Sequence, residues 1–139
     1  MIKVFCQYLS LSELPNNIDL MAYNEFIRPL DYEFSLERGA EYLVIAIVER
    51  KGIPWLYVTS NNNGDTEIDI VPAVLFSFDN SSIISGMIIR MTNTPQPSLE
   101  ILPVRLSSID NWFERYIDGD DAVIDIIESE INVFRSRSK

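Results

Sequence analysis

Short apolar runs rich in β-forming residues, the first of which alternates loosely with polar residues, occupy much of the first hundred positions, and such runs are typical of β-strands. Strands are predicted over residues 2–9, 31–35, 42–50, 53–60, 67–78, 83–91 and 99–106. Residues 10–29 differ, because Ile18, Met21 and Phe26 have helical spacing, and a short helix ending near Pro29 is predicted there. The first three quarters of the chain therefore read mainly as sheet.

Two of these runs form the clearest pair. Residues 42–50 and 53–60 are separated by Lys51 and Gly52 alone, which is the spacing of a two-residue hairpin, and glycine readily takes positive φ. The first run is apolar on both faces, which predicts a central strand covered on both sides. Pro72 indicates a sheet edge or a bulge, since proline cannot donate a hydrogen bond to a neighbouring strand.

The period changes after residue 106. Apolar residues at helical spacing predict an amphipathic helix with Ser107 or Ser108 as its cap: Ile109, Trp112, Phe113, Tyr116 and Ile117. Gly119 ends that helix, and Asp120 or Asp121 caps a second one, whose apolar positions are Val123, Ile127, Ile131 and Phe134. Strands followed by helices predict a single α+β domain over residues 1–139, a mainly antiparallel sheet with the C-terminal pair of helices packed on it.

The composition disfavours catalysis. The 139 residues include no histidine, one cysteine, and 21 acidic against 11 basic residues. Histidine is the side chain that most often shuttles protons and binds metals near neutral pH. Cys6 lies in an apolar strand without a histidine to activate it, and neither a Gly-x-Ser-x-Gly elbow nor a phosphate-binding glycine pattern occurs. We therefore expect a protein that is not an enzyme and uses no cofactor.

The formal net charge of −10 limits the partners. Nucleic acids and anionic membranes are bound through clustered Lys and Arg, so neither is expected. No apolar run approaches the roughly 20 residues that span a bilayer, no signal-peptide pattern begins the chain, and a lone cysteine suits a reducing compartment. A cytoplasmic, bacterial protein is expected.

Acidic residues concentrate in the C-terminal helices. Between Ser107 and Ile131 there are eight acids and one base, and Asp121, Asp125 and Glu128 share one helix face, where like charges repel. One interpretation is a solvated face of an acidic protein. The other is a docking surface for a basic protein partner, with these contact residues: Asp110, Glu114, Asp118, Asp121, Asp125 and Glu128.

Two other groups of residues have a functional and a structural interpretation. Asp65, Glu67 and Asp69 at alternate positions would suit Mg²⁺ in a hydrolase, but no base follows between Lys51 and Arg90, and a solvent-facing strand is favoured, so no metal site is predicted. Aromatic residues would line a ligand pocket in a small-molecule binding or sensory domain, or form core: Trp55, Tyr57 and Trp112. Strand edges near Pro72 or Pro103 would allow a homodimer.

Three segments resemble small bacterial immunity proteins, the cytoplasmic antidotes encoded beside toxins. They are Glu37–Val44, Gly52–Val58 and Val71–Phe76, and the resemblance covers about residues 37–90. The shared features are a Gly-x-x-Tyr start of a strand, a hairpin and a strand running from proline to phenylalanine. The resemblance implies a non-catalytic domain that blocks a toxin, often a basic nuclease, and it identifies no binding residue in this chain.

Overall fold

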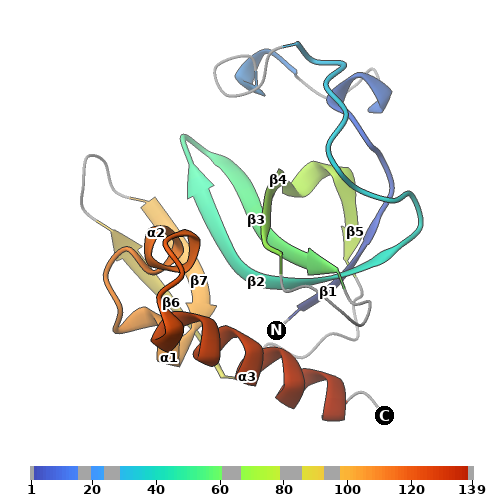
Figure 1. The fold of residues 1–139 in the computed structure, drawn as a ribbon. Coiled ribbons are helices and arrows are strands. Elements are labelled where there is room, and N and C mark those ends of the chain that lie inside the picture. Colours follow the sequence, from blue (N-terminus) through green and yellow to red (C-terminus); the bar gives the residue numbers. More distant parts are fainter. Residues whose placement is uncertain are drawn as a thin grey trace.

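The computed structural model shows a curled antiparallel sheet with helices from the C-terminal part of the chain against it (Figure 1). It describes residues 2–15, 20–23, 29–60, 67–78, 86–92 and 98–137. Seven strands form the sheet: β1 (Ile2–Cys6), β2 (Glu41–Arg50), β3 (Ile53–Ser60), β4 (Asp69–Pro72), β5 (Phe76–Phe78), β6 (Met87–Thr92) and β7 (Ser98–Pro103). The predicted α+β class with a mainly antiparallel sheet is confirmed.

The predicted hairpin joins β2 to β3. Lys51 has φ 52° and Gly52 has φ 81°, so both turn residues are left-handed. A turn with two left-handed residues matches the right-handed twist of the flanking strands, which explains why two residues suffice. β2 is also the central strand that its apolar sequence predicts, because it pairs with β1, β3 and β7.

The sheet divides into two wings along β2. One edge of β2 pairs with β3, whereas the other edge pairs first with β1 and then, at Ile47 and Val48, with β7. Between these two partners the register against β3 shifts at Ile45, which is an extra residue between Val44 and Ala46. A bulge bends its strand and increases the twist. The bulge therefore lies where the β1–β5 wing and the β7–β6 wing separate.

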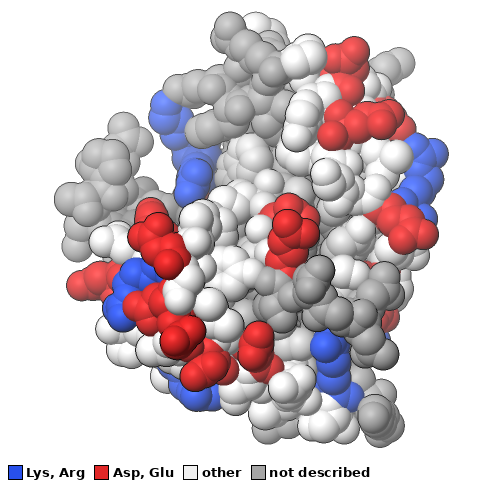
Figure 2. Space-filling model, viewed as in Figure 1, with Lys and Arg blue, Asp and Glu red and all other residues white. Residues whose placement is uncertain are grey.

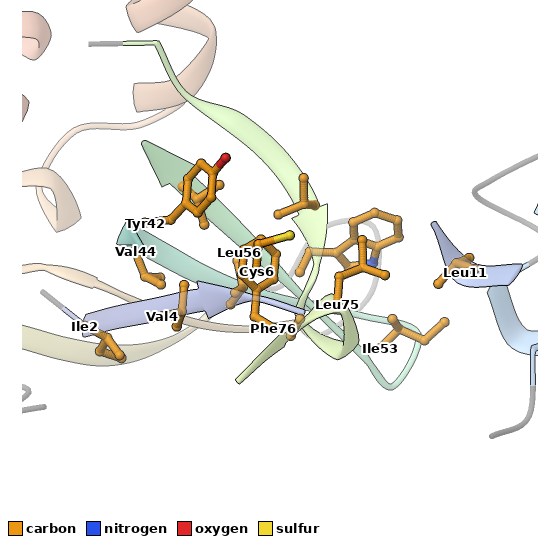
Figure 3. Packing of buried hydrophobic residues seen from close by; sticks show 14 of the residues in the cluster. Ile2, Val4, Cys6, Leu11, Tyr42, Val44, Ile53, Leu56, Leu75 and Phe76 are labelled. Atoms are coloured by element: carbon orange, nitrogen blue, oxygen red, sulfur yellow. The ribbon is translucent and has the colours of Figure 1, made fainter. Parts of the chain in front are cut away.

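The β1–β5 wing encloses the first hydrophobic cluster (Figure 3). Val4 of β1, Val44 of β2 and Leu56 of β3 are fully buried there. Phe76 of β5 packs edge-on against Tyr42, with 5.9 Å between ring centroids, and Leu11 reaches the cluster from a 3-10 turn at Leu11–Glu13. No residue of the C-terminal helices belongs to this first cluster among the described residues.

The second hydrophobic cluster lies between the sheet and three helices, α1 (Val104–Ser107), α2 (Trp112–Ile117) and α3 (Asp121–Arg137). The apolar stripe predicted for the last helix is buried, with Val123 and Ile127 fully enclosed. It packs in one cluster with Leu43 and Ile45, which point to the opposite side of β2 from Val44. The predicted packing of C-terminal helices on the sheet is confirmed.

Four predicted elements differ from the structure. The strand predicted over residues 67–78 is divided into β4 and β5 by a 3-10 turn at Ala73–Leu75. Residues 31–35 form no strand; the amide of Tyr32 bonds the carbonyl of Pro29 in a turn. The helix predicted within residues 10–29 is replaced, where the chain is described, by 3-10 turns at Leu11–Glu13 and Met21–Tyr23, and Ile18 and Phe26 lie outside the described residues. The last strand ends at Pro103, and residues 104–106 are helical.

The predicted serine caps of the helix after residue 106 are wrong. The hydroxyl of Ser107 donates to the carbonyl of Val104 (2.6 Å) and that of Ser108 to the carbonyl of Arg105 (3.3 Å), so both hydroxyls bind within α1. Asn111 precedes α2 instead, with φ 55° and no side-chain cap. Asparagine tolerates the left-handed conformation better than most residues, which suits it to this sharp junction.

Candidate functional site

The six acidic residues expected to contact a partner are all exposed. They are Asp110, Glu114, Asp118, Asp121, Asp125 and Glu128, and are called the acidic surface below. They come from the turn between α1 and α2, from α2, from the α2–α3 junction and from α3, and α2 contacts α3. Figure 2 shows acidic side chains gathering over this part of the molecule.

Helix α3 sets the direction of half of this surface. Asp121, Asp125 and Glu128 lie within about 60° of one another around the helix axis, given a turn of 3.6 residues. Val123 and Ile127 occupy the opposite side and are fully buried. Because the apolar stripe of α3 is buried, the three carboxylates on the opposite side of the helix face solvent.

The two arginines within this region are engaged in ion pairs of their own. Arg115 binds Asp120 through Nε (2.8 Å) and Nη2 (2.7 Å), and Arg105 lies 3.8 Å from the carboxylate of Glu130. None of the six residues of the acidic surface forms an ion pair with any residue in the described part of the chain. The local bases therefore leave the charge of the surface uncompensated.

The acidic surface continues onto the sheet, which the sequence does not predict. Burial raises the pKa of Tyr116 in α2, and the negative charges of Glu67, Glu128 and Asp69 raise it further. The Tyr116 hydroxyl also hydrogen-bonds the backbone of Ile68. Carboxylates from β4, from the residues before it and from α3 thus surround the same tyrosine. Glu67 and Glu128 are about 60 residues apart, so no local pattern indicates that both lie near Tyr116.

Asp69 is the most enclosed carboxylate of this extension. Burial raises its pKa above the ordinary range, and the neighbouring charge of Glu67 raises it further. Asp65, the third residue considered for Mg²⁺, lies outside the described residues. Within the described ranges, no three His, Cys, Asp or Glu side chains are grouped as metal ligands would be. Glu67 and Asp69 are therefore best described as part of a negatively charged surface.

Asp120 has a structural role next to the acidic surface. Its Oδ1 accepts hydrogen bonds from the amides of Ala122 (3.0 Å) and Val123 (3.4 Å), which caps α3 as the sequence predicts, while Gly119 with φ 81° ends the preceding helix. The hydrogen bond from Arg115 lowers the pKa of Asp120 most, and the amide hydrogen bonds lower it further. The carboxylate is thus held in its charged form.

We predict that this charge stabilises the fold at neutral pH. A lowered folded-state pKa means that the stabilisation is complete above the unfolded-state pKa and disappears as the pH falls through the folded-state value. Asp120→Asn retains a capping oxygen but loses the charge, whereas Asp120→Ala loses both. The melting temperature at pH 7 should therefore fall from wild type to Asn to Ala. At a pH below the folded-state pKa, where the carboxylate is protonated, the melting temperatures of wild type and Asp120→Asn should coincide; a difference that persists there would contradict this assignment.

Of the three aromatic residues considered for a ligand pocket, Trp55 lies apart from Tyr57 and Trp112. Trp55 belongs to the first hydrophobic cluster and Trp112 to the second. The Trp112 ring packs edge-on against Tyr57 (5.4 Å between centroids) and Phe113 (5.7 Å), and Tyr57 stacks on Phe113 (4.9 Å). Aromatic rings in mutual edge-on and stacked contact are typical of a packed core.

Cys6 offers no nucleophile. Its side chain is buried in β1, its Sγ lies 3.4 Å from the carbonyl oxygen of Tyr8, and burial raises the pKa of the thiol. A raised pKa keeps the sulfur protonated at neutral pH and therefore unreactive. Cys6 is an ordinary buried thiol of the core.

Comparisons of the chain with models of protein families, with curated proteins and with solved structures find no match. Among the described residues, no helix has the length and apolar character needed to cross a membrane.

Proposed function

We propose that the protein is a non-catalytic binding protein whose acidic surface docks a basic protein partner. The observation that carries this proposal is the set of six exposed carboxylates on α2, α3 and their connections, none of which is paired with a base in the described part of the chain. Like charges on one helix face weaken that helix, by a few tenths of a kcal/mol per pair. A basic partner would relieve this repulsion on binding.

The charge pattern also suits rapid and selective association. A surface of one sign steers an oppositely charged partner during encounter, and it repels wrong partners of the same sign. Glu67 and Asp69 widen the surface across Tyr116. The helices and the start of β4 thereby contribute to one negative region, which suits the surface of a folded basic domain.

The most concrete form of the proposal is an immunity protein, cytoplasmic and bacterial, that neutralises a basic toxin. The resemblance of residues 37–90 to such proteins supports this class. Its shared features have structural roles here: the amide of Gly39 bonds the carbonyl of Cys6, and the Tyr42 hydroxyl accepts a hydrogen bond from the amide of Glu37 (2.9 Å). Docking is therefore assigned to the acidic surface and not to the segments that carry the resemblance.

The gene next to the one for this protein provides the test. We expect its product to arrest growth when expressed alone, to be harmless when co-expressed with this protein, and to form a complex with it. Because the attraction is electrostatic, the association rate should fall steeply as NaCl is raised above roughly 0.15 M, where the Debye length is about 8 Å. A harmless product that does not bind, or a complex whose association rate ignores salt, would contradict the proposal.

A further inference from the structure

Strand β6 leaves one edge of the sheet without a neighbour in the described part of the chain. Met87–Thr92 pairs with β7 over six residue pairs and with no other described strand. Its sequence, Met-Ile-Ile-Arg-Met-Thr, contains no proline, no glycine and no acid. An edge of this kind exposes a row of backbone N–H and C=O groups that can pair with another strand.

The other two outer strands are protected in ways that β6 is not. β4 has four residues, ends at Pro72, which cannot donate a ladder hydrogen bond, and carries the acidic Asp69. β5 has only three residues. Short strands, proline and charge are the usual devices against edge-to-edge pairing. β6 has six residues, contains no proline and carries a single charge, Arg90, which is paired with Glu100, so it is the edge on which pairing is least opposed.

The face of β6 that carries Met87, Ile89 and Met91 is apolar and largely exposed. Ile89 is 66% exposed and Met91 57% on one face, and Ile88 is 36% exposed on the other. Val104 of α1, 49% exposed, extends this apolar area, because its amide bonds the carbonyl of Gly86 directly before β6. The strand's one charge, Arg90, is held by Glu100 (2.9 Å) and by the carbonyl of Ser107 (2.6 Å).

We propose that the protein forms a symmetric homodimer by antiparallel pairing of β6 with β6 of a second copy. Charge favours a second copy over a basic partner at this edge. The chain has a net charge of −10, but β6 contains no acid that would attract a basic partner, and its Arg90 is paired with Glu100. The backbone groups gain partners, and the apolar face of Met87, Ile89 and Met91 meets the same face of the second copy. Such an interface is self-complementary, as a two-fold axis requires.

The two-fold axes that pair most of Met87–Thr92 with its copy lie at Ile89 and at Arg90. Residues directly opposite each other in an antiparallel pair lie on the same face of the sheet. The two-fold axis must therefore lie between one residue and its own copy, and not midway between two successive residues. An axis at Ile89 sets Ile89 against its copy and Met87 against Met91. An axis at Arg90 would set two guanidinium groups against each other, which is destabilising. The axis is therefore assigned to Ile89.

Sedimentation velocity of the full chain over a concentration series tests the dimer. We expect dimer at roughly 100 µM and, for Ile89→Lys, a dissociation constant raised at least about 100-fold, because the axis places both copies of the substitution at the centre. Ile117→Lys is the matched control, since Ile117 in α2 is 65% exposed and should leave the dimer intact. A wild-type chain that stays monomeric, or equal effects of the two substitutions, would overturn the proposal.

A cross-link tests the register independently. Ile89→Cys should give a disulfide-linked dimer under mild oxidation, since opposite Cβ atoms at an antiparallel pair lie about 5 Å apart and a disulfide needs little less. The native Cys6 is buried and supplies a clean background. Ile117→Cys should not cross-link. Failure of Ile89→Cys to cross-link while the wild type dimerises would overturn the register.

Salt separates this inference from the proposed function. Two copies of net charge −10 repel, so screening should strengthen the dimer as NaCl is raised. Docking of a basic partner should weaken under the same change. A dimer that dissociates with added salt would contradict apolar pairing at β6 without bearing on the partner.

Discussion

Reversing the charge of one face of α3 is expected to slow docking of the basic partner about 100-fold at low salt. The variant is the triple substitution Asp121→Lys, Asp125→Lys and Glu128→Lys, whose positions share the exposed face of that helix. Steering depends on the sign of the potential that the partner meets, so reversal removes attraction and adds repulsion. Stopped-flow association rates over a series of NaCl concentrations provide the measurement.

The control changes the same net charge at another place. Glu33→Lys, Glu37→Lys and Glu49→Lys alter three exposed acids outside the C-terminal helices. If the acidic surface is the dock, the control triple should reduce the rate only modestly, and its salt dependence should remain close to that of the wild type. Equal slowing by both triples would show that net charge alone matters, and an unchanged rate for the α3 triple would remove α3 from the interface.

Loss of folding does not explain such a result, because the substituted positions contribute little to stability. The three side chains are exposed and form no ion pair among the described residues. Their mutual repulsion weakens the helix by a few tenths of a kcal/mol per pair, and three lysines at the same spacing restore a similar repulsion. Circular dichroism and melting temperatures of both triples should therefore match those of the wild type.

Sequence patterns predicted the local elements of this fold well wherever one strong periodic signal controlled the outcome. The β2–β3 hairpin follows from two apolar runs and a glycine, and α3 follows from its buried stripe and the Asp120 cap. The class of fold followed from their order. The start of α2 shows where local patterns failed. Ser107 and Ser108 are residue types that often cap helices, but their hydroxyls bind carbonyls of α1, and Asn111 with positive φ precedes α2 instead.

Long-range pairing was the part that sequence could not supply. The bulge at Ile45 lets β2 pair with β1 and then with β7, and nothing in the run from residue 42 to 48 distinguishes a bulged strand from a regular one. The same holds for the acidic surface. Its helical half was visible as a local excess of acids, whereas the placement of Glu67 and Asp69 near Tyr116 of α2 follows from the tertiary fold.

Replacing Trp112 by alanine is expected to lower the free energy of unfolding by about 4 kcal/mol, because large aromatic-to-alanine changes in a core combine lost apolar burial with a residual cavity. Trp112 is 5% exposed and its ring contacts those of Tyr57 and Phe113. Urea unfolding followed by far-ultraviolet circular dichroism gives the free energy, since the substitution removes one of the two tryptophan fluorophores.

The matched comparison is Ile117→Ala in the same helix. Ile117 is 65% exposed, so its truncation should change the free energy of unfolding by less than about 0.5 kcal/mol. This pair also separates the two interpretations of the aromatic residues. A ring that lines an open ligand pocket already contacts solvent, and its removal opens little new cavity. A small loss of stability for Trp112→Ala would therefore favour a small-molecule binding domain over a packed core. The large loss expected here would mean that the aromatic residues form core, so that binding is left to the exposed side of the helices.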